Sequence, residues 1–269
     1  MTEEEQFEVQ NENPRDGEVL IQVSHVGKSF GGRPVLKDIS FEVKAHETLG
    51  IIGVSGCGKS TLLRIISGLE TPDVGEVHLS NPNYSLVFQY SALFDSLTVL
   101  ENVAFSLLER PDGDYEKALG QGAQRRKKYS VAEIRDIVAE KLRMVGLEGI
   151  EDQYPNSLSG GMKKRVSFAR AIVSNPRIIL YDEPTAGLDP IASTVIEDYI
   201  RKLRDELNAA SVVVTHQFST INRTDRVILL HEGEVQWTGT PKELMSTDNA
   251  YAQQFAHASL KGPMALEQH

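Results

Sequence analysis

Residues 53–61 place the strongest constraint on how this chain can fold. They read Gly-Val-Ser-Gly-Cys-Gly-Lys-Ser-Thr and match the pattern G-x-x-x-x-G-K-[ST], a loop that wraps around the phosphates of a nucleotide. An apolar run at 48–53 leads into the loop as a buried strand would, and residues 62–66 leave it as a helix would. The sequence therefore predicts a strand–loop–helix unit that binds phosphate, and a flexible glycine-rich turn is the alternative.

Each part of the loop has a physical role in holding phosphate. Glycines let the backbone turn tightly and aim its N–H groups at phosphate oxygens, and the N-terminus of the following helix adds positive partial charge. We expect Lys59 to reach the β- and γ-phosphates, and the hydroxyl of Ser60 to be a ligand of Mg²⁺. The residues predicted to contact the nucleotide are Gly53, Val54, Ser55, Gly56, Cys57, Gly58, Lys59, Ser60 and Thr61.

Cys57 is the only cysteine of the chain. A single cysteine rules out an internal disulfide and fits a reducing compartment such as the cytosol. Its place near a helix N-terminus favours the thiolate. We therefore expect a reactive thiol that bound nucleotide protects from labelling, and a buried, inert thiol is the alternative.

Composition and charge exclude several classes of protein. The net charge of −10 argues against a general nucleic-acid binder. The sequence holds no run of about 18 apolar residues that would span a membrane, and its acidic start is unlike a secretory signal. The basic run 125–128 is interpreted as a solvated surface, with a phosphate or lipid-headgroup contact as the alternative.

Strands and helices alternate along the chain, which predicts an α/β core with a mostly parallel sheet. Two strands joined at the glycine pair 31–32 precede the phosphate loop as an antiparallel β element. The predicted strands are 19–23, 39–43, 48–53, 76–79, 85–88, 177–181, 211–215 and 227–230, the last entering a hairpin with 235–237. The predicted helical segments are 62–66, 101–108 and 131–145, with an exposed loop at 111–130.

This pattern divides the chain into four parts. We expect a flexible tail at 1–17, a nucleotide-binding domain at 18–245 and, inserted into that domain, a helical subdomain at about 93–157. Residues 246–269 form a C-terminal extension. Within it, residues 251–257 are predicted to be either a short helix that packs on a partner or a frayed end.

A second element of a phosphate site lies at 177–183, where an apolar strand ends in two carboxylates. A strand end can turn both side chains towards one cleft, although they would alternate within the strand. We expect Asp182 to hold Mg²⁺, directly or through water, and Glu183 to be the base that orients and deprotonates an attacking water. A solvated acidic turn is the alternative.

Residues 158–162, Leu-Ser-Gly-Gly-Met, predict a second helix N-terminus that can bind an anion. Ser159 is the expected N-cap, and the two glycines, Gly160 and Gly161, open the helix. The chain then has two phosphate-binding motifs but only one lysine-bearing loop. The simplest explanation is that the second motif serves a nucleotide held by another copy of the chain.

In this order, the motifs resemble the nucleotide-binding subunit of ABC transporters over about residues 18–240. The resemblance implies a P-loop NTPase fold of the ABC type, with ATP and Mg²⁺ as cofactors. It identifies 158–162 as the family signature, which closes on the ATP of the opposite subunit. It also implies that Lys59, Glu183 and His216 are catalytic.

The resemblance assigns roles to four further positions, each with an alternative. Phe30 matches the aromatic residue that stacks on adenine, or else it is a core residue. Gln89 matches the glutamine that contacts Mg²⁺ and senses the membrane partner, or else it is a surface residue. Asp189 matches the loop that crosses the dimer interface, or it caps the following helix, or it does both. His216 matches the histidine on the γ-phosphate, or it is a structural histidine.

The signature also departs from the commonest family pattern, because Met162 stands where glutamine is usual. Together with residues 161–166 and 88–99, this departure resembles the Mla/Mce-type lipid-trafficking subgroup. ATPases of that subgroup work with a membrane permease and a lipid-shuttle protein. Apolar residues after Gln89, such as Leu93, Phe94 and Leu97, are predicted contacts for the permease.

The resemblance implies a homodimer that sandwiches two ATP molecules and drives an integral permease. Such a subunit would lie peripherally on the cytoplasmic face of the inner or plasma membrane, with a lipid-shuttle or substrate-binding protein as a further partner and no nucleic acid. The alternatives are an importer ATPase for another small substrate and a soluble ABC-type ATPase that acts on nucleic acid or ribosomes. A different P-loop enzyme, such as a small-molecule kinase, would leave residues 158–161 without a role.

Overall fold

The computed structural model describes residues 17–108 and 129–264. The expectations for residues 1–16, for the basic run 125–128 and for nearly all of the loop 111–130 lie outside the described residues.

A three-stranded antiparallel sheet forms the N-terminal part, with the order β2-β1-β4. Its strands are β1 (Val19–Phe30), β2 (Arg33–Lys44) and β4 (Val74–Leu79). A two-residue turn joins β1 to β2 through Gly31 and Gly32, whose φ angles of 55° and 77° are both positive. Hairpin turns of type I′ require positive φ at both central residues, which glycine adopts without strain. The predicted antiparallel element and its turn are therefore confirmed.

A six-stranded sheet forms the centre, with the order β5-β6-β7-β3-β8-β9. Neighbouring strands run parallel except β9, which pairs antiparallel with β8. The strands are β3 (Thr48–Ile52), β5 (Tyr84–Val87), β6 (Ile178–Asp182), β7 (Ala210–Val214), β8 (Arg226–His231) and β9 (Glu234–Gly239). The prediction of an α/β core with a mostly parallel sheet is confirmed.

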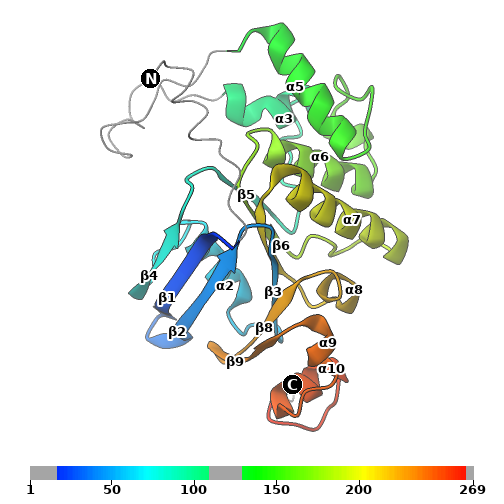
Figure 1. Ribbon diagram of the computed structural model, residues 1–269. Helices are drawn as coiled ribbons and strands as arrows, with labels where there is room; N and C mark the ends of the chain where they lie inside the picture. The colour runs from blue at the N-terminus through cyan, green and yellow to red at the C-terminus, as the bar shows by residue number, and fades with distance from the viewer. Residues whose placement is uncertain (1–16, 109–128, 265–269) are drawn as a thin grey trace.

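Helices α3, α5, α6 and α7 gather at one end of the molecule, and α9 and α10 lie at the other (Figure 1). None of the helices in 17–108 and 129–264 combines the length and the apolar character needed to cross a membrane. The helices are α2 (Lys59–Ile66), α3 (Val99–Leu108), α5 (Val131–Met144), α6 (Gly160–Ile172), α7 (Pro190–Leu207), α8 (Phe218–Ile221), α9 (Pro241–Leu244) and α10 (Ala250–Ala256), with a 3-10 turn, η1 (Pro155–Ser157), before α6.

The central sheet is buried on both faces, and alternation along its strands separates two cores. In β6, Ile178 and Leu180 pack into a cluster shared with α2 and the antiparallel sheet. The residues between and after them, Ile179 and Tyr181, pack into a cluster shared with α3, α5, α6 and α7. Successive side chains of a strand point to opposite faces, so α2 and α6 cover opposite faces of the sheet.

The C-terminal extension packs onto its own chain. Ala252 and Ala256 of α10 are buried in a cluster with Leu229 of β8. The side chain of Gln254 accepts a hydrogen bond from the N–H of Met264 at 2.7 Å and donates one to the carbonyl of Met264 at 3.0 Å. Helix formation near residues 251–257 is confirmed, and the frayed-end alternative is wrong.

Two positions on α5 offer a matched test of the helical core. Leu142 is fully buried, whereas Val131 is 76% exposed at the start of the same helix. We expect Leu142→Ala to lower the free energy of unfolding by about 2–5 kcal/mol, because it leaves a cavity. Val131→Ala should change it by less than about 0.5 kcal/mol. Urea titration followed by circular dichroism measures both, and equal midpoints would contradict the assigned core.

Candidate nucleotide site

The phosphate loop runs from the carboxyl end of β3 to the first turn of α2. The first hydrogen bond of that helix joins the N–H of Leu62 to the carbonyl of Gly58 at 2.9 Å. The N–H groups of residues 59–61 precede it, so they have no helical acceptor and are available to an anion. Gly58 has a φ of 108°, and a Cβ there would lie 2.9 Å from the carbonyl oxygen of Val35. Only glycine fits this position without a shift of the backbone.

Lys59 is nearly buried, at 9% exposure, and its ammonium lies inside the loop. Its Nζ donates to the carbonyl oxygens of Gly53 at 2.9 Å and Val54 at 3.0 Å. An ammonium has three N–H donors, so one remains for a phosphate oxygen. The loop therefore fixes the charge at its centre.

Asp182 meets Ser60 across the edge of the sheet, because β6 and β3 end on the same side. The hydroxyl of Ser60 donates to Oδ1 of Asp182 at 3.1 Å. Two oxygen ligands in neighbouring positions around Mg²⁺ are about 3 Å apart, because each lies at about 2.1 Å from the ion at right angles. The spacing and the hard oxygen donors of this pair fit Mg²⁺.

Glu183 meets His216 at the ends of neighbouring strands. The N–H of Glu183 donates to the carbonyl of Val214, the last residue of β7, at 2.9 Å, which places residue 183 beside the segment that follows β7. The Nδ1 of His216 lies 2.8 Å from Oε1 of Glu183. The other carboxylate oxygen, Oε2, is buried and has no hydrogen-bond partner among the described residues.

The backbone at Glu183 is unusual. Its φ of 45° is in the left-handed region, which residues other than glycine seldom adopt. The side chain is 12% exposed, while that of His216 is 62% exposed. The chain therefore turns sharply where the predicted base stands.

The signature residues begin α6 as the sequence predicts. The hydroxyl of Ser159 accepts from the N–H of Met162 at 3.2 Å, so the N-cap is confirmed. Both Ser159 and Gly160 are exposed. None of the hydrogen bonds found in 17–108 and 129–264 joins residues 159–161 to the phosphate loop.

Asp189 caps α7, so the predicted capping role of this residue is confirmed. Its Oδ1 accepts from the N–H groups of Ile191 at 2.9 Å and Ala192 at 3.0 Å. Capping leaves the residue itself exposed at the surface. A role at a dimer interface remains a prediction.

Phe30 is 46% exposed at the end of β1, so the core alternative is wrong for this residue. The Nζ of Lys28 lies 5.2 Å from the centre of its ring. That ammonium is held by Glu70 at 2.7 Å and Asp73 at 3.2 Å. An anchored, partly exposed ring is suited to stack on a flat ligand.

Two cations on α6 hold the segment that follows β5, and the sequence analysis did not single out either of them. The Nζ of Lys164 donates to the carbonyl of Gln89, whose side chain is exposed. The guanidinium of Arg170 donates to the carbonyls of Ser91 at 3.0 Å and Ala92 at 2.8 Å. Their acceptors are backbone carbonyls more than 70 residues away in the sequence, so no local pattern singles out either residue.

Burial lowers the pKa of Lys164, and the carboxylate of Asp182 opposes part of that shift. Lys164 as a whole is 5% exposed. Its electrostatic interaction with Asp182 connects the segment at Gln89 to the predicted metal ligand. The structure thus brings Gln89 near the metal site through Lys164.

The predicted permease contacts have unequal exposure. Phe94 is 43% exposed and stacks on Phe105 with ring centres 4.7 Å apart. Leu93 and Leu97 are half-buried, and Leu93 packs against the helical core. Tyr90, which the sequence did not single out, is 79% exposed.

The environment of Cys57 differs from the one expected for a reactive thiol. The thiol is buried, and burial raises its pKa, with smaller opposing effects from Lys59 and backbone N–H groups. The expected thiolate is therefore wrong. Desolvation by the surrounding loop and core outweighs the favourable field of the helix N-terminus.

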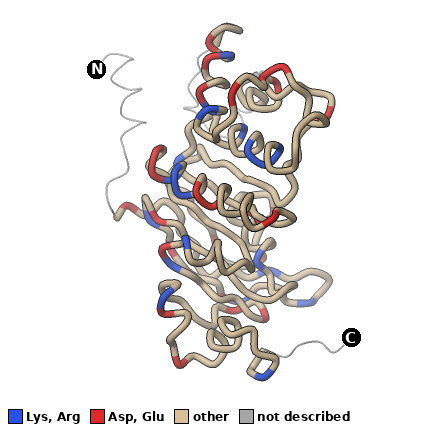
Figure 2. The backbone as a smooth tube through the Cα atoms, turned by 90° about the vertical axis from the view of Figure 1, so that its right-hand side faces the viewer, with Lys and Arg blue, Asp and Glu red and all other residues tan. Residues whose placement is uncertain are grey.

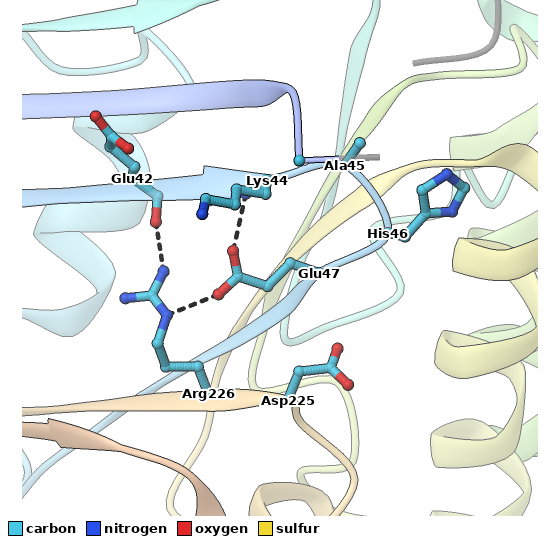
Figure 3. A pocket seen from close by; sticks show the side chains of 8 residues that line it. Glu42, Lys44, Ala45, His46, Glu47, Asp225 and Arg226 are labelled. Carbon is cyan, nitrogen blue, oxygen red and sulfur yellow. Dashed lines mark hydrogen bonds and ion pairs between the residues drawn. The ribbon is translucent and has the colours of Figure 1, made fainter. Parts of the chain in front are cut away.

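A hollow of about 600 Å³ lies elsewhere, at the amino ends of β3 and β8 (Figure 3). Glu47 in this hollow is engaged by its own chain: Oε1 binds the guanidinium of Arg226 at 2.7 Å, and Oε2 accepts from the backbone N–H of Lys44 at 2.8 Å. Ligands of open α/β sheets bind at the carboxyl ends of the strands. The phosphate loop is at those ends, so the hollow is not the nucleotide site.

The fold and the groups that converge at residues 53–61, 182–183 and 216 define a P-loop NTPase of the ABC type. Residues 36–186 match the family described as ABC transporter, and the chain belongs to that family. By this membership the protein is an ATPase that binds ATP and couples its hydrolysis to transport.

Two curated relatives show how far the likeness extends. The chain is 44% identical to "Protein TRIGALACTOSYLDIACYLGLYCEROL 3, chloroplastic" of Arabidopsis thaliana over 93% of this chain and 76% of the relative. It is 39% identical to the sulfate/thiosulfate import ATP-binding protein CysA of Bordetella pertussis over 83% of this chain and 63% of the relative. The chain thus spans less than two thirds of the length of that importer subunit.

Two solved structures share the fold. One is a dimeric post-hydrolysis state of the ATP-binding cassette MJ0796 bound to ADP and Pi, with a TM-score of 0.70 and 33% identity over 82% of this chain and 98% of that one. The other is cbiO1 of Clostridium perfringens, described as part of the ABC transporter complex cbiONQ. It has a TM-score of 0.72 and 27% identity over 88% of this chain and 94% of that one.

The burial of Cys57 leads to a prediction about its reactivity. We expect a maleimide to label the native protein slowly at pH 7, because little thiolate forms in a buried group whose pKa is raised. Labelling should be equally slow with and without MgATP and rapid in urea. Mass spectrometry of timed samples measures the rates, and protection that depends on nucleotide would show that the thiol opens to solvent in the free protein.

Proposed function

We propose that this chain is the ATP-hydrolysing subunit of a membrane transporter, that it closes with a second copy around two ATP molecules, and that the transporter moves lipid. The observation that carries the proposal is the convergence at one edge of the sheet. Ser60 meets Asp182 at 3.1 Å, and Glu183 meets His216 at 2.8 Å, beside the phosphate loop. ATP hydrolysis requires these groups together.

The bound nucleotide would be held mainly by the phosphate loop. Lys59 and the N–H groups of residues 59–61 would donate to phosphate oxygens, and Phe30 would stack on adenine. Ser60 and Asp182, with the side chain of Gln89, would hold Mg²⁺, whose remaining ligands come from phosphates and water. When bound, the ion neutralises charge that develops on the phosphates.

Hydrolysis would use Glu183 as general base. As the water oxygen bonds to the γ-phosphorus, the bond from that phosphorus to the β–γ bridging oxygen breaks and ADP leaves. The proton of the water passes to the carboxylate of Glu183 and later to solvent. His216 would hold Oε1 of the same carboxylate and contact the γ-phosphate.

A second copy would complete the site. Ser159 is exposed at the start of α6, and none of the hydrogen bonds among the described residues joins residues 159–161 to their own phosphate loop. The signature would therefore close on ATP held by the other subunit, as the dimeric state of MJ0796 makes plausible for a related chain. Asp189, exposed at the start of α7, would lie at the same interface.

Lipid as the cargo is supported by the Arabidopsis relative, whose name contains that of a galactolipid and whose likeness covers 93% of this chain. The Met162 signature and its flanks, which resemble those of the Mla/Mce-type lipid-trafficking subgroup, also favour lipid. An importer of another small substrate is the second candidate, supported by the CysA relatives. Their lower identity and shorter coverage make it the weaker one.

The partners follow from this proposal. An integral permease would dock on the exposed apolar surface after Gln89, a lipid-shuttle protein would deliver substrate, and the subunit would lie on the cytoplasmic face of the inner or plasma membrane. Lys and Arg positions alternate with Asp and Glu over the described chain (Figure 2), which does not favour a nucleic-acid surface. The ATP-binding domain would comprise residues 18–245, with a helical subdomain at about 93–157 and the extension at 246–269.

The role of Glu183 predicts the behaviour of two variants. Glu183→Gln keeps the shape but removes the base, so kcat should fall by roughly 10²–10⁴-fold while ATP binding survives. ATP should then accumulate in a closed dimer, which size-exclusion chromatography with MgATP detects. Adding Ser159→Arg should abolish that dimer, because bulk and charge enter the interface.

Two outcomes would contradict this scheme separately. A Glu183→Gln protein with the kcat of the wild type would place the base elsewhere. A double variant that still dimerises on MgATP would show that the signature does not complete the site of the other copy.

The permease surface predicts a second result. Tyr90 is 79% exposed, so Tyr90→Asp should leave the fold intact while it places a charge where an apolar partner docks. We expect the permease to be lost from the complex purified in detergent, with unchanged ATP affinity. Leu69→Asp, at a residue 62% exposed after α2, is the control. Full recovery of permease with Tyr90→Asp would move the docking surface elsewhere.

A further inference from the structure

A buried carboxylate on α7 stands outside the roles described so far. Glu197 is 2% exposed, and its Oε1 accepts from the hydroxyls of Ser219 at 2.6 Å and Thr220 at 2.8 Å. Its Oε2 lies 3.5 Å from Nε of Arg223. A buried carboxylate is tolerated only with such partners, so these groups fix one another's positions.

The network around Glu197 contains residues that follow the catalytic residues closely in the sequence. Ser219 and Thr220 belong to α8, which begins two residues after His216. The hydroxyl of Thr220 also lies 3.3 Å from that of Thr185, two residues after Glu183. One buried network therefore connects α7 to the segments that carry the base and the histidine, and Figure 1 shows α8 next to α7.

The C-terminal extension adds an apolar contact to α8. The rings of Phe218 and Phe255 are 5.8 Å apart, and both pack against a cluster that contains Ile221. Helix α8 has only four residues and would have little stability alone. Its position therefore depends on these contacts with α7 and α10.

The surroundings of Glu197 exclude a ligand as the reason for the network. The void beside it, which Thr220 and Arg223 also line, is only about 10 Å³. That space is about enough for one water molecule. The carboxylate thus acts on groups of the protein itself.

We propose that Glu197 is a positioning residue for ATP hydrolysis: it fixes α8 and thereby holds His216 in reach of Glu183. The proposal rests on the proposed role of His216. The proposal also has a consequence for closure of the dimer, because Glu197 lies on α7, the helix that Asp189 caps. A displacement of α7 at the dimer interface moves α8 and His216 with it, so hydrolysis responds to the presence of the second copy.

The test compares substitutions at Glu197 with a matched control. Glu197→Leu removes both acceptors at similar size, and Glu197→Gln keeps one acceptor oxygen. Glu206→Leu changes an exposed carboxylate of the same helix, which pairs with Lys202 at 3.7 Å. For Glu197→Leu we expect kcat to fall by roughly 10- to 100-fold, as displacement of a catalytic group by about 1 Å can cause.

Further readouts separate positioning from loss of fold. The Kd for ATP should stay within about twofold of the wild type, because the phosphate loop is untouched. Glu197→Gln should recover part of kcat, and Glu206→Leu should equal the wild type. If Glu197→Leu does not fold, Thr220→Val is the alternative test. It removes one hydrogen-bond donor to Glu197 at nearly unchanged shape. It should lower kcat by less than the roughly 10- to 100-fold expected for Glu197→Leu, with an unchanged Kd for ATP.

A double-mutant cycle with His216→Ala decides the matter. If Glu197 acts through His216, Glu197→Leu adds little to the loss of kcat in the His216→Ala background. Two outcomes would overturn this inference and leave the role of His216 intact. In one, the losses of kcat in the two single variants multiply in the double variant. In the other, Glu197→Leu has the kcat of the wild type while His216→Ala is impaired. A His216→Ala protein with the kcat of the wild type would instead remove the proposed role of His216, and this inference with it.

Discussion

The parallel register of β6, β7 and β3 is the constraint on which the site depends. Val214 of β7 pairs with Ile51 of β3 on one side and with Asp182 of β6 on the other, so three strands end at one edge. The residues that follow those ends are the phosphate loop, Glu183 and the segment of His216. A slip of one residue in β6 would send Asp182 to the opposite face and separate it from Ser60.

Burial of the sheet on both faces imposes the second constraint. The strands contribute alternate side chains to two cores, one with α2 and one with α6. The two helices whose N-termini suit phosphate therefore pack on opposite faces of the sheet. Under the proposed function, the N-terminus of α6 serves ATP held by another copy.

Motif spacing and periodicity predicted the features that depend on residues close together in the sequence. The spacing of residues 53–61, the apolar strands and the Ser159 cap could all be predicted, because turn chemistry and periodicity act over a few residues. The anchors Lys164 and Arg170 and the buried Glu197 could not, since their partners are distant in sequence and a charged residue usually lies at the surface. The prediction for Cys57 was wrong for the same reason, because burial by distant residues outweighed the local helix field.

Under the proposed function, these contacts between residues distant in sequence determine how ATP binding at the dimer interface affects the permease surface and His216. ATP can drive a change only through its different affinities for the open and closed states. Lys164 and Arg170 join the segment 89–92 to the helix that begins at the signature, so closure on the partner's ATP displaces the permease surface together with α6. Glu197 joins α7 to α8 in the same way, which makes the position of His216 depend on the interface. The buried charges of Lys164 and Glu197 therefore lie where rigid connection between segments is needed, and the apolar cores supply the stability that offsets their desolvation.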